Sequence, residues 1–265
     1  MSRFSHFLVN LKIADQRNIQ EHLAGGTAVH GISRFSDMSQ EEFSLRFLRA
    51  DATMKSNDSK KQVISTPPKA DMGLVDWTGK LTTPVKDQGY CGSCWAFSAT
   101  EQIESDTIRT QGSTFVLSPE QITQCDKGSF GCGGGWTETA YGYVRRAGGI
   151  TTEAAYPYTS YSGTTGTCKV DSSTFKVSVS GFHTLGSEAE MASYVQTTGP
   201  LSICIDANNW NSYTGGILKV CGTSVDHCVQ AVGVDASTGG YWKVTRTYTC
   251  TLWTLTYFIL CIKCL

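Results

Sequence analysis

The chain has 265 residues and a formal net charge of −1, with 40% hydrophobic and 17% charged residues. It can therefore bury a sizeable core, and it lacks the strongly basic character that nucleic-acid binding requires. Its eleven cysteines point to an oxidising compartment. Because the first thirty residues contain no signal peptide, we expect an amino terminus that is incomplete or mis-started. The alternative is a cytosolic protein that keeps its thiols reduced.

The first zone, residues 1 to about 48, has the periodicity of helices. Apolar side chains recur three and four residues apart, as at Phe4, Leu8 and Leu11. Further on, "SDMSQEEF" combines an N-cap serine with a glutamate three residues later, which predicts the start of a second helix.

Residues 50 to 71 are polar and charged and include a double proline, which predicts an exposed connector open to proteolysis. Within it, Asn57-Asp58-Ser59 fits a glycosylation acceptor, a pattern that also arises often by chance.

From Val75 onward the sequence predicts one strong helix, Trp95 to Thr110, and then glycine- and β-rich sequence. A helical lobe followed by a β lobe is an α+β architecture with a cleft between the lobes. The strand-like runs are residues 175–182, 200–207, 226–235 and 241–244.

Two cysteines, Cys91 and Cys94, lie three apart just before the predicted helix. A structural zinc site needs a second pair nearby, and the other C-x-x-C, Cys261 to Cys264, lies at the far end of the chain. A redox pair usually follows a buried strand, which "TGKLTTPVKDQGY" does not provide. We therefore expect no metal, a nucleophilic Cys94 whose thiolate the helix N-terminus favours, and a structural Cys91.

A thiolate nucleophile needs a base, and the chain has five histidines. Three lie in the first zone and His183 lies before a glycine turn, so all four are expected at the surface. His227 lies in an apolar β run, where an uncommitted imidazole would be costly. It is either a satisfied core histidine or the group that takes the proton of Cys94 and returns it to a leaving amine.

The segment around Cys94, together with His227, resembles a known protein family. "DQGYCGSCWAFS" is similar to the active-site signature of the papain and cathepsin family of cysteine proteases, and His227 follows Cys94 at the family's spacing of roughly 130–150 residues. The resemblance implies the family's papain-like two-lobed fold. Further segments resemble the family in the family's order: "PVKDQG", "LSPEQITQCD", "GCGGGW", "AYPYT", "GPLSICIDA" and "VDHCVQAVGVD".

The first zone resembles the family's inhibitory prosegment, and "GISRFSD" fits its turn motif. Ala14 and Ser33 depart mildly from the usual isoleucine and asparagine. The resemblance implies an inactive precursor with a prosegment at 1–49, incomplete at its amino end, and a linker with the processing site at 50–71. The helical motif of the prosegment is matched by Arg3, Phe7, Asn10 and Asn18.

Site roles follow from the same resemblance. Gln88 matches the glutamine that donates to the oxyanion of the tetrahedral intermediate. Gly134 and Gly135 match the segment that pairs with an extended substrate backbone, where a side chain would block close approach. The pocket for the substrate's second residue before the cut, which should take an apolar side chain, is matched by Trp136, Cys204, Val225 and Cys228.

The resemblance also implies cysteine pairing. Cys91 should pair with Cys132 and Cys125 with Cys168, while Cys221 matches a cysteine whose partner lies near the carboxyl terminus. For Cys204 and Cys228 both a disulfide and two free thiols stay open.

After Val244 the chain departs from the family. A basic residue and Asn-Ser-Trp-Gly, whose asparagine orients the histidine, are replaced by "TRTYTCTLWTLTYFILCIKCL". This apolar run is too short to span a bilayer, which needs roughly twenty residues. We expect a peptidase domain at 72–244 that lacks its closing strands, and an aberrant tail at 245–265 from a frameshift or retained intron, or a real truncated product.

The function that the sequence favours is a cysteine endopeptidase made as an inactive precursor. It would act on polypeptides as a monomer, with its own prosegment as inhibitor and with no cofactor, nucleic acid or membrane span. The family expectation for its location is a lysosome-like vacuole or the extracellular space. The alternative is a non-catalytic relative that acts only by binding, or a non-functional by-product.

Overall fold

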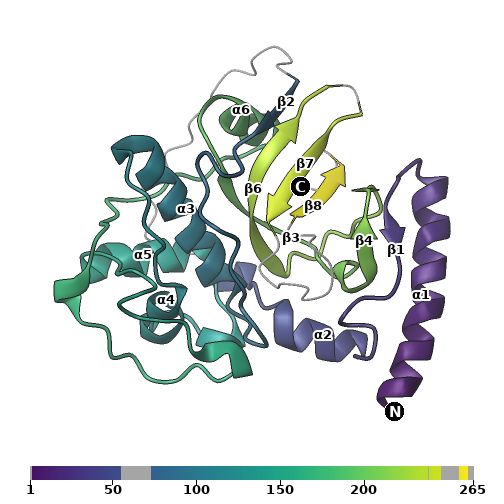
Figure 1. Cartoon of the computed structure of the whole chain (residues 1–265), viewed down its shortest axis with the longest axis horizontal. Helices are drawn as coiled ribbons and strands as arrows, with labels where there is room; N and C mark the ends of the chain where they lie inside the picture. Colours follow the sequence, from purple (N-terminus) through teal and green to yellow (C-terminus); the bar gives the residue numbers. More distant parts are fainter. Residues whose placement is uncertain (1, 55–72, 238, 246–256, 262–265) are drawn as a thin grey trace.

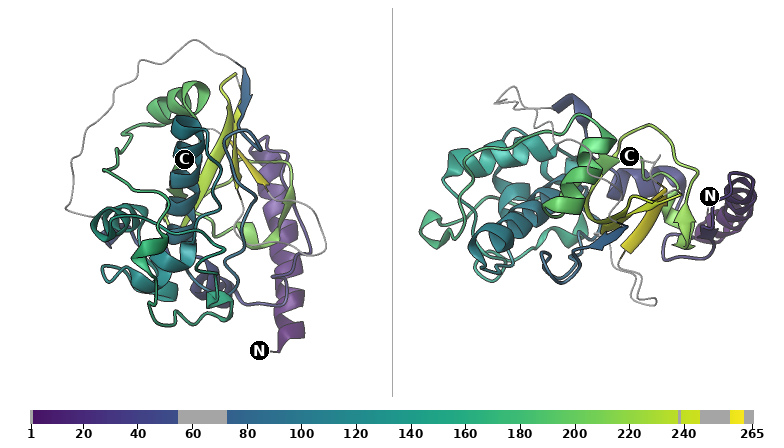
Figure 2. Two further views of the ribbon diagram at one scale, coloured as in Figure 1. Left: turned by 60° about the vertical axis from the view of Figure 1, so that its left-hand side comes forward. Right: turned by 90° about the horizontal axis from the view of Figure 1, so that it is seen from above.

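The computed structural model describes residues 2–54, 73–237, 239–245 and the backbone of 257–261. Within these residues, helices and strands separate into two lobes, and the amino-terminal segment lies against the β lobe (Figure 1). Seen from above, the first helix stands at the outer side of the β lobe, far from the helical lobe (Figure 2). The α+β fold expected from the sequence is thus confirmed.

Both helices predicted in the first zone form. Helix α1 spans Arg3–Leu23, and α2 spans Gln40–Phe47 with the predicted N-cap Ser39, whose hydroxyl accepts the backbone N–H of Glu42. The two helices are tied together because the guanidinium of Arg3 donates to both carboxylate oxygens of Glu42, each at 2.7 Å. This double contact has the planar, two-point geometry that arginine and carboxylate prefer.

The amino-terminal segment is tied to the β lobe by a short sheet. Strand β1, Val29–His30, pairs antiparallel with β4, Tyr213–Gly215. Beyond α2, the one-turn helix η1 spans Ala52–Met54. The chain therefore passes from the side of the β lobe to the junction of the two lobes.

The helical lobe is built around α3, Cys94–Gln111, one residue longer at each end than the prediction. Gly112 ends this helix with a φ of 65°, a left-handed conformation that glycine adopts without a Cβ penalty. The remaining elements of the lobe are α4 (Pro119–Cys125), η2 (Gly131–Gly133), α5 (Thr137–Ala147), η3 (Ser160–Ser162) and η4 (Ser172–Thr174).

In the β lobe, the strand order is β2-β6-β7-β8-β5, and β3 pairs with β6. The predicted strands at 200–207, 226–235 and 241–244 are confirmed. Helix α6, Glu188–Thr197, and the turn η5, Trp210–Ser212, complete the lobe. The strands are β2 (Leu74–Asp76), β3 (Leu201–Ile205), β5 (Ile217–Leu218), β6 (His227–Asp235), β7 (Tyr241–Thr245) and β8 (Tyr257–Cys261).

Two strand expectations are wrong. Residues 175–182 form no strand, because Val177 has a single bridge to Ile150 and no neighbouring strand continues the ladder. The expected absence of closing strands also fails, since β8 pairs antiparallel with β7 and parallel with β5. Its sequence of aromatic and apolar residues has high strand propensity, and β7 offers it an edge.

Candidate active site

Cys94 is the first residue of α3 and is fully buried. Burial raises the pKa of its thiol to about 11, although the nearby backbone N–H groups of Cys228, Arg49 and Trp95 act in the opposite direction. Desolvation favours the neutral form of a buried acid, and here it outweighs the helix N-terminus. In this form of the chain, burial therefore favours the thiol of Cys94 over the thiolate.

His227 is the first residue of β6 and is also fully buried. Its ring meets the ring of Trp210 edge to face, with centroids 5.7 Å apart and planes at 80°. Because the backbone N–H of the next residue, Cys228, lies close enough to lower the pKa of Cys94, the two predicted catalytic residues lie on adjoining segments at the junction of the lobes.

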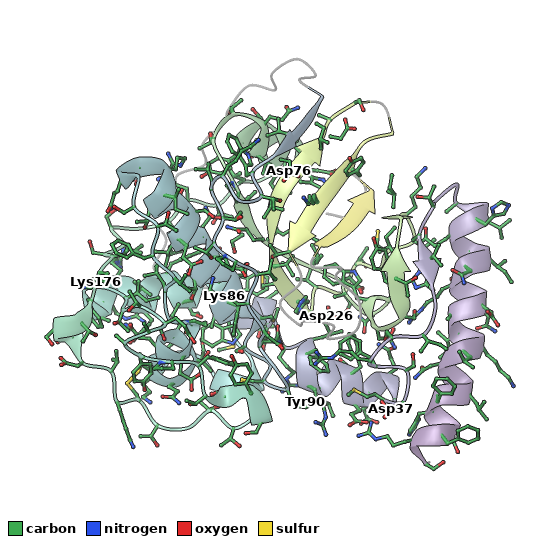
Figure 3. The ribbon with its side chains drawn as sticks, viewed as in Figure 1. Asp37, Asp76, Lys86, Tyr90, Lys176 and Asp226 are labelled. Atoms are coloured by element: carbon green, nitrogen blue, oxygen red, sulfur yellow. A yellow bond between two sulfur atoms is a disulfide. The ribbon has the colours of Figure 1, made fainter. Side chains whose placement is uncertain are left out.

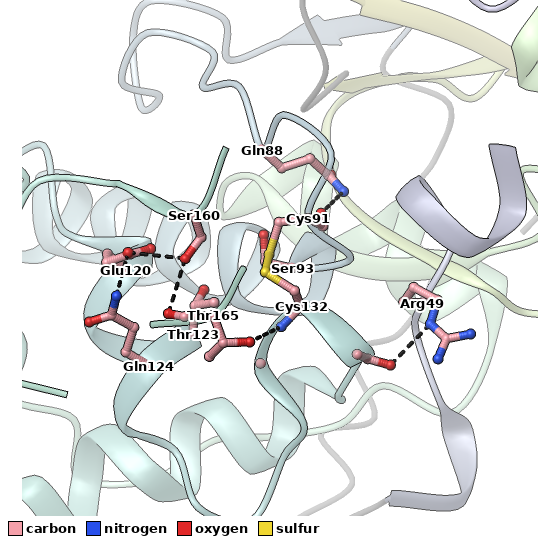
Figure 4. Close-up of a disulfide and its surroundings, with 12 residues drawn as sticks. Arg49, Gln88, Cys91, Ser93, Glu120, Thr123, Gln124, Cys132, Ser160 and Thr165 are labelled. Carbon is pink, nitrogen blue, oxygen red and sulfur yellow. Dashed lines mark hydrogen bonds between the residues drawn. A yellow bond between two sulfur atoms is a disulfide. The ribbon is translucent and has the colours of Figure 1, made fainter. Parts of the chain in front are cut away.

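Gln88 lies in the loop before α3 and is fully buried. Its side-chain amide donates to the carbonyl of Cys91 at 2.9 Å and to that of Phe47 at 3.4 Å. Figure 4 shows this amide beside the disulfide between Cys91 and Cys132. The side-chain N–H groups of Gln88 therefore lie beside the loop that leads into Cys94.

The segment after α2 crosses the junction in an extended conformation. The N–H of Ala50 donates to the carbonyl of Asp226 at 2.9 Å, and the N–H of Asp51 donates to the carbonyl of Gly135 at 3.0 Å. In return, Gly135 donates to the carbonyl of Arg49 at 3.2 Å. The backbone of residues 49–51 therefore binds both lobes directly over Cys94, as a peptide would.

The glycines predicted to pair with an extended backbone lie against this one. A Cβ on Gly135 would lie 2.6 Å from the indole of Trp95, and a Cβ on Gly134 would lie 2.4 Å from the carbonyl oxygen of Arg49. Gly134 also has a φ of 123°, which side chains rarely allow. At both positions close approach requires glycine.

A cavity of about 550 Å³ lies between α3, α5, α6 and β3 and is closed on another side by the irregular segment 177–185. Two of the four predicted pocket residues, Trp136 and Cys204, line it. Of the other two, Val225 is 40% exposed, and Cys228 is fully buried. Only part of the predicted pocket, Trp136 and Cys204, therefore lies at this cavity.

The structure settles the open cysteine question. Cys204 and Cys228 form a disulfide across β3 and β6, where they are direct partners in the ladder. Cys221 is also disulfide-bonded, while the carboxyl-terminal partner predicted for it lies outside the described residues. The two pairs implied by the resemblance, Cys91–Cys132 and Cys125–Cys168, are present.

Sequence reasoning missed one buried and one half-buried polar group. His30, expected at the surface, is 4% exposed, and its Nδ1 lies 2.9 Å from the hydroxyl of Ser212. It is buried because β1 docks on β4, a contact that local sequence does not encode. Arg17 lies in the same contact and donates to Ser212 at 2.7 Å.

Asp226 was not singled out from the sequence either, although it precedes the predicted base. Its carboxylate accepts the N–H of Ala207 at 2.9 Å and the side-chain amide of Asn208 at 2.6 Å. Burial raises the pKa of Asp226 to about 7. Figure 3 shows Asp226 at the end of β6 that lies near α2.

A fold of two lobes, with a cysteine at a helix start, a histidine at a strand start and a chain segment across both, defines a thiol peptidase in its precursor form. The profile described as papain family cysteine protease matches residues 73–261, and the cathepsin propeptide inhibitor domain matches residues 1–43. The chain belongs to the papain family of cysteine proteases and is made as a zymogen with its own inhibitory propeptide.

Relatives agree with this assignment. Digestive cysteine proteinase 1 of Homarus americanus is 36% identical over 93% of this chain and 78% of its own length. Cysteine proteinase 1 of Dictyostelium discoideum is 33% identical over 89% and 73%. The structure of digestive procathepsin L2 proteinase from Tenebrio molitor larval midgut superposes with a TM-score of 0.84 at 30% identity, covering 98% of this chain and 86% of that one.

In the part of the chain that the structure describes, no helix has the length and apolar character needed to cross a membrane. The same residues contain no cluster of three or more histidine, cysteine, aspartate or glutamate side chains suited to a metal ion.

Proposed function

We propose that the chain is the precursor of a cysteine endopeptidase that uses Cys94 as nucleophile and His227 as general base and acid. The imidazole takes the thiol proton, and the thiolate attacks the scissile carbonyl. His227 then gives the proton to the leaving amine, and water hydrolyses the thioester. The observation that carries this proposal is the position of Cys228, the neighbour of His227, whose backbone N–H acts on the thiol of Cys94 and lowers its pKa.

Two donors serve the tetrahedral intermediate in this proposal. The former carbonyl oxygen becomes negative, and the side-chain amide of Gln88 and the backbone N–H of Cys94 donate to it. Gln88 now donates to carbonyl oxygens, so the oxyanion would replace a neutral acceptor by a charged one.

The substrate backbone is proposed to lie where residues 49–51 lie in the precursor. A polypeptide there would pair with Gly135, as Arg49 and Asp51 do. An apolar side chain of this polypeptide would reach the cavity beside Trp136 and Cys204.

We further propose that activation cuts the linker at 50–71. A monomeric peptidase domain, including residues 72–244, then acts in a lysosome-like vacuole or outside the cell.

The test is covalent labelling after acid processing. A peptidyl epoxide or vinyl sulfone should label Cys94 in the processed chain, and the Cys94→Ser variant, matched in size, should remain unlabelled. Mass spectrometry of the peptide that contains residue 94 gives the answer. A folded, processed wild-type chain that takes no label would leave the alternative, a relative that only binds proteases or peptides.

A further inference from the structure

The disulfide between Cys204 and Cys228 lies beside His227, one of the two proposed catalytic residues. Cys228 follows His227 directly, and its backbone N–H acts on the thiol of Cys94. In the ladder of β3 and β6, Cys204 is opposite Cys228, and Ile205 is opposite His227. The crosslink is therefore one residue pair away from the imidazole.

The side chains of the crosslink face the lobe that carries the nucleophile. Residues alternate across a sheet, so the neighbours Ile203 and Val229 point the other way and belong to the core of the β lobe. The two cysteines instead pack in the cluster of the helical lobe. In that cluster they share a core with Trp95, Ala96 and Ala99 from the first turns of α3 and with Trp136.

The pair Ile205 and His227 is the last of its ladder, because β3 ends at Ile205 and β6 begins at His227. Terminal pairs open more readily than central ones. In the precursor the adjacent backbone also binds the propeptide, through the N–H of Ala50 and the carbonyl of Asp226. Processing removes that contact, and the bond from Asp226 N–H to Ile205 at 3.0 Å and the crosslink remain.

We propose that the Cys204–Cys228 disulfide is a positioning element that keeps His227 against Cys94 once the propeptide has left. This inference rests on the proposed function. With the disulfide intact, the end of the ladder stays closed and the imidazole can accept the thiol proton. Without it, the end opens and Cys94 titrates as an isolated thiol.

The experiment measures the reactivity of Cys94 itself and not only hydrolysis. The whole chain, with a site for a specific protease placed in the linker at residues 60–65, is cut, and the propeptide is removed. Iodoacetamide alkylation of Cys94 is then followed by peptide mass spectrometry from pH 4 to pH 10. The test variant is C204A/C228A, and the control C125A/C168A removes the disulfide between α4 and the loop at Cys168.

The wild type should react rapidly at pH 6, because a thiolate paired with an imidazolium persists well below the ordinary thiol pKa of about 8.5. In C204A/C228A the rate at pH 6 should fall about tenfold or more, and the profile should become a single titration near that value. The control should keep the wild-type profile even where its melting temperature is lower.

A folded C204A/C228A variant with the wild-type profile would overturn the positioning role alone. A wild type that shows no reactivity at pH 6 would overturn the proposed catalytic pair and this inference with it. The hydrolysis of a peptide substrate, measured in parallel, separates these two outcomes.

A second measurement serves if the variant does not fold. The processed wild type is reduced stepwise with dithiothreitol, which gives two electrons and two protons to each disulfide and becomes a cyclic disulfide itself. The loss of reactivity at pH 6 should track the appearance of free Cys204 and Cys228. A loss that instead tracks free Cys125 and Cys168 would overturn the proposal.

Discussion

Gln88 is a single residue whose buried amide already has two acceptors. Replacing it with alanine should lower kcat about a hundredfold with little change in KM, because it removes one donor that acts on the transition state. Gln88→Glu should lose as much, since a carboxylate cannot donate to an oxyanion. Kinetics of the processed chain check this, with melting curves to establish folding, and a kcat within threefold of the wild type would contradict it.

His30 gives the propeptide contact a pH dependence. Burial lowers the pKa of its imidazole to about 4, and the charge of Arg17 acts in the same direction. The undocked imidazole titrates near its usual value of about 6.5. Between these two values the undocked form binds a proton that the docked form excludes, so docking weakens as the pH falls from about 6.5 to about 4. Above that window both forms are neutral, and the effect vanishes.

Hydrogen exchange of the full chain checks this sign. After correction for intrinsic rates, protection of the backbone amides of β1 and β4 should fall about tenfold or more between pH 7 and pH 4.5. His30→Gln should show a much weaker fall, because glutamine does not titrate. His183→Gln, at an exposed histidine, is the matched control and should behave as the wild type. Equal pH dependence in all three chains would refute a role for His30.

Among the elements, the loop between η2 and α5 depends on Gly135. In Gly135→Ala the added methyl would lie 2.6 Å from the indole of Trp95 and would push the loop away from the backbone of residues 49–51. We expect the free energy of unfolding to fall by about 1–3 kcal/mol, which is typical of overpacking. We also expect weaker binding of the propeptide.

Gly181→Ala is the matched control for this change, because a Cβ there meets nothing within 4 Å. Denaturant unfolding of both variants gives their free energies of unfolding. The rate at which Cys94 is alkylated in the intact precursor reports how tightly the propeptide is bound. If Gly135→Ala had the same unfolding free energy and the same Cys94 alkylation rate as Gly181→Ala, the close contact of Gly135 with Trp95 would not be needed.

At the scale of the whole molecule, we expect the propeptide to change the pKa of Cys94. In the precursor, burial holds the pKa of Cys94 at about 11. Removal of residues 49–51 readmits water, so the pKa should fall by several units towards or below the ordinary thiol value. The thiolate absorbance of precursor and processed chain, each with Cys94→Ser subtracted as control, measures the shift. An unchanged pKa would show that the propeptide is not what keeps the thiol neutral.

Local sequence determined several elements of this protein. The cap and periodicity around Ser39 predicted α2, the helical stretch from Trp95 to Thr110 predicted α3, and the apolar run that begins near His227 predicted β6. Such signals depend on residues within one or two turns or along a single strand, so the sequence contains them in full. The expected nucleophile, Cys94, and its expected base, His227, lie in the same short segments.

Tertiary structure decided everything that required a distant partner. Residues 175–182 have strand-like sequence but no strand beside them, whereas 257–261 form β8 because β7 offers an edge. His30 is buried only because β1 docks on β4. The register of β3 on β6 placed Cys204 opposite Cys228, and the packing of the two lobes buried Cys94 and raised the pKa of its thiol. Register, docking and burial join segments far apart in the chain, so no local pattern could specify them.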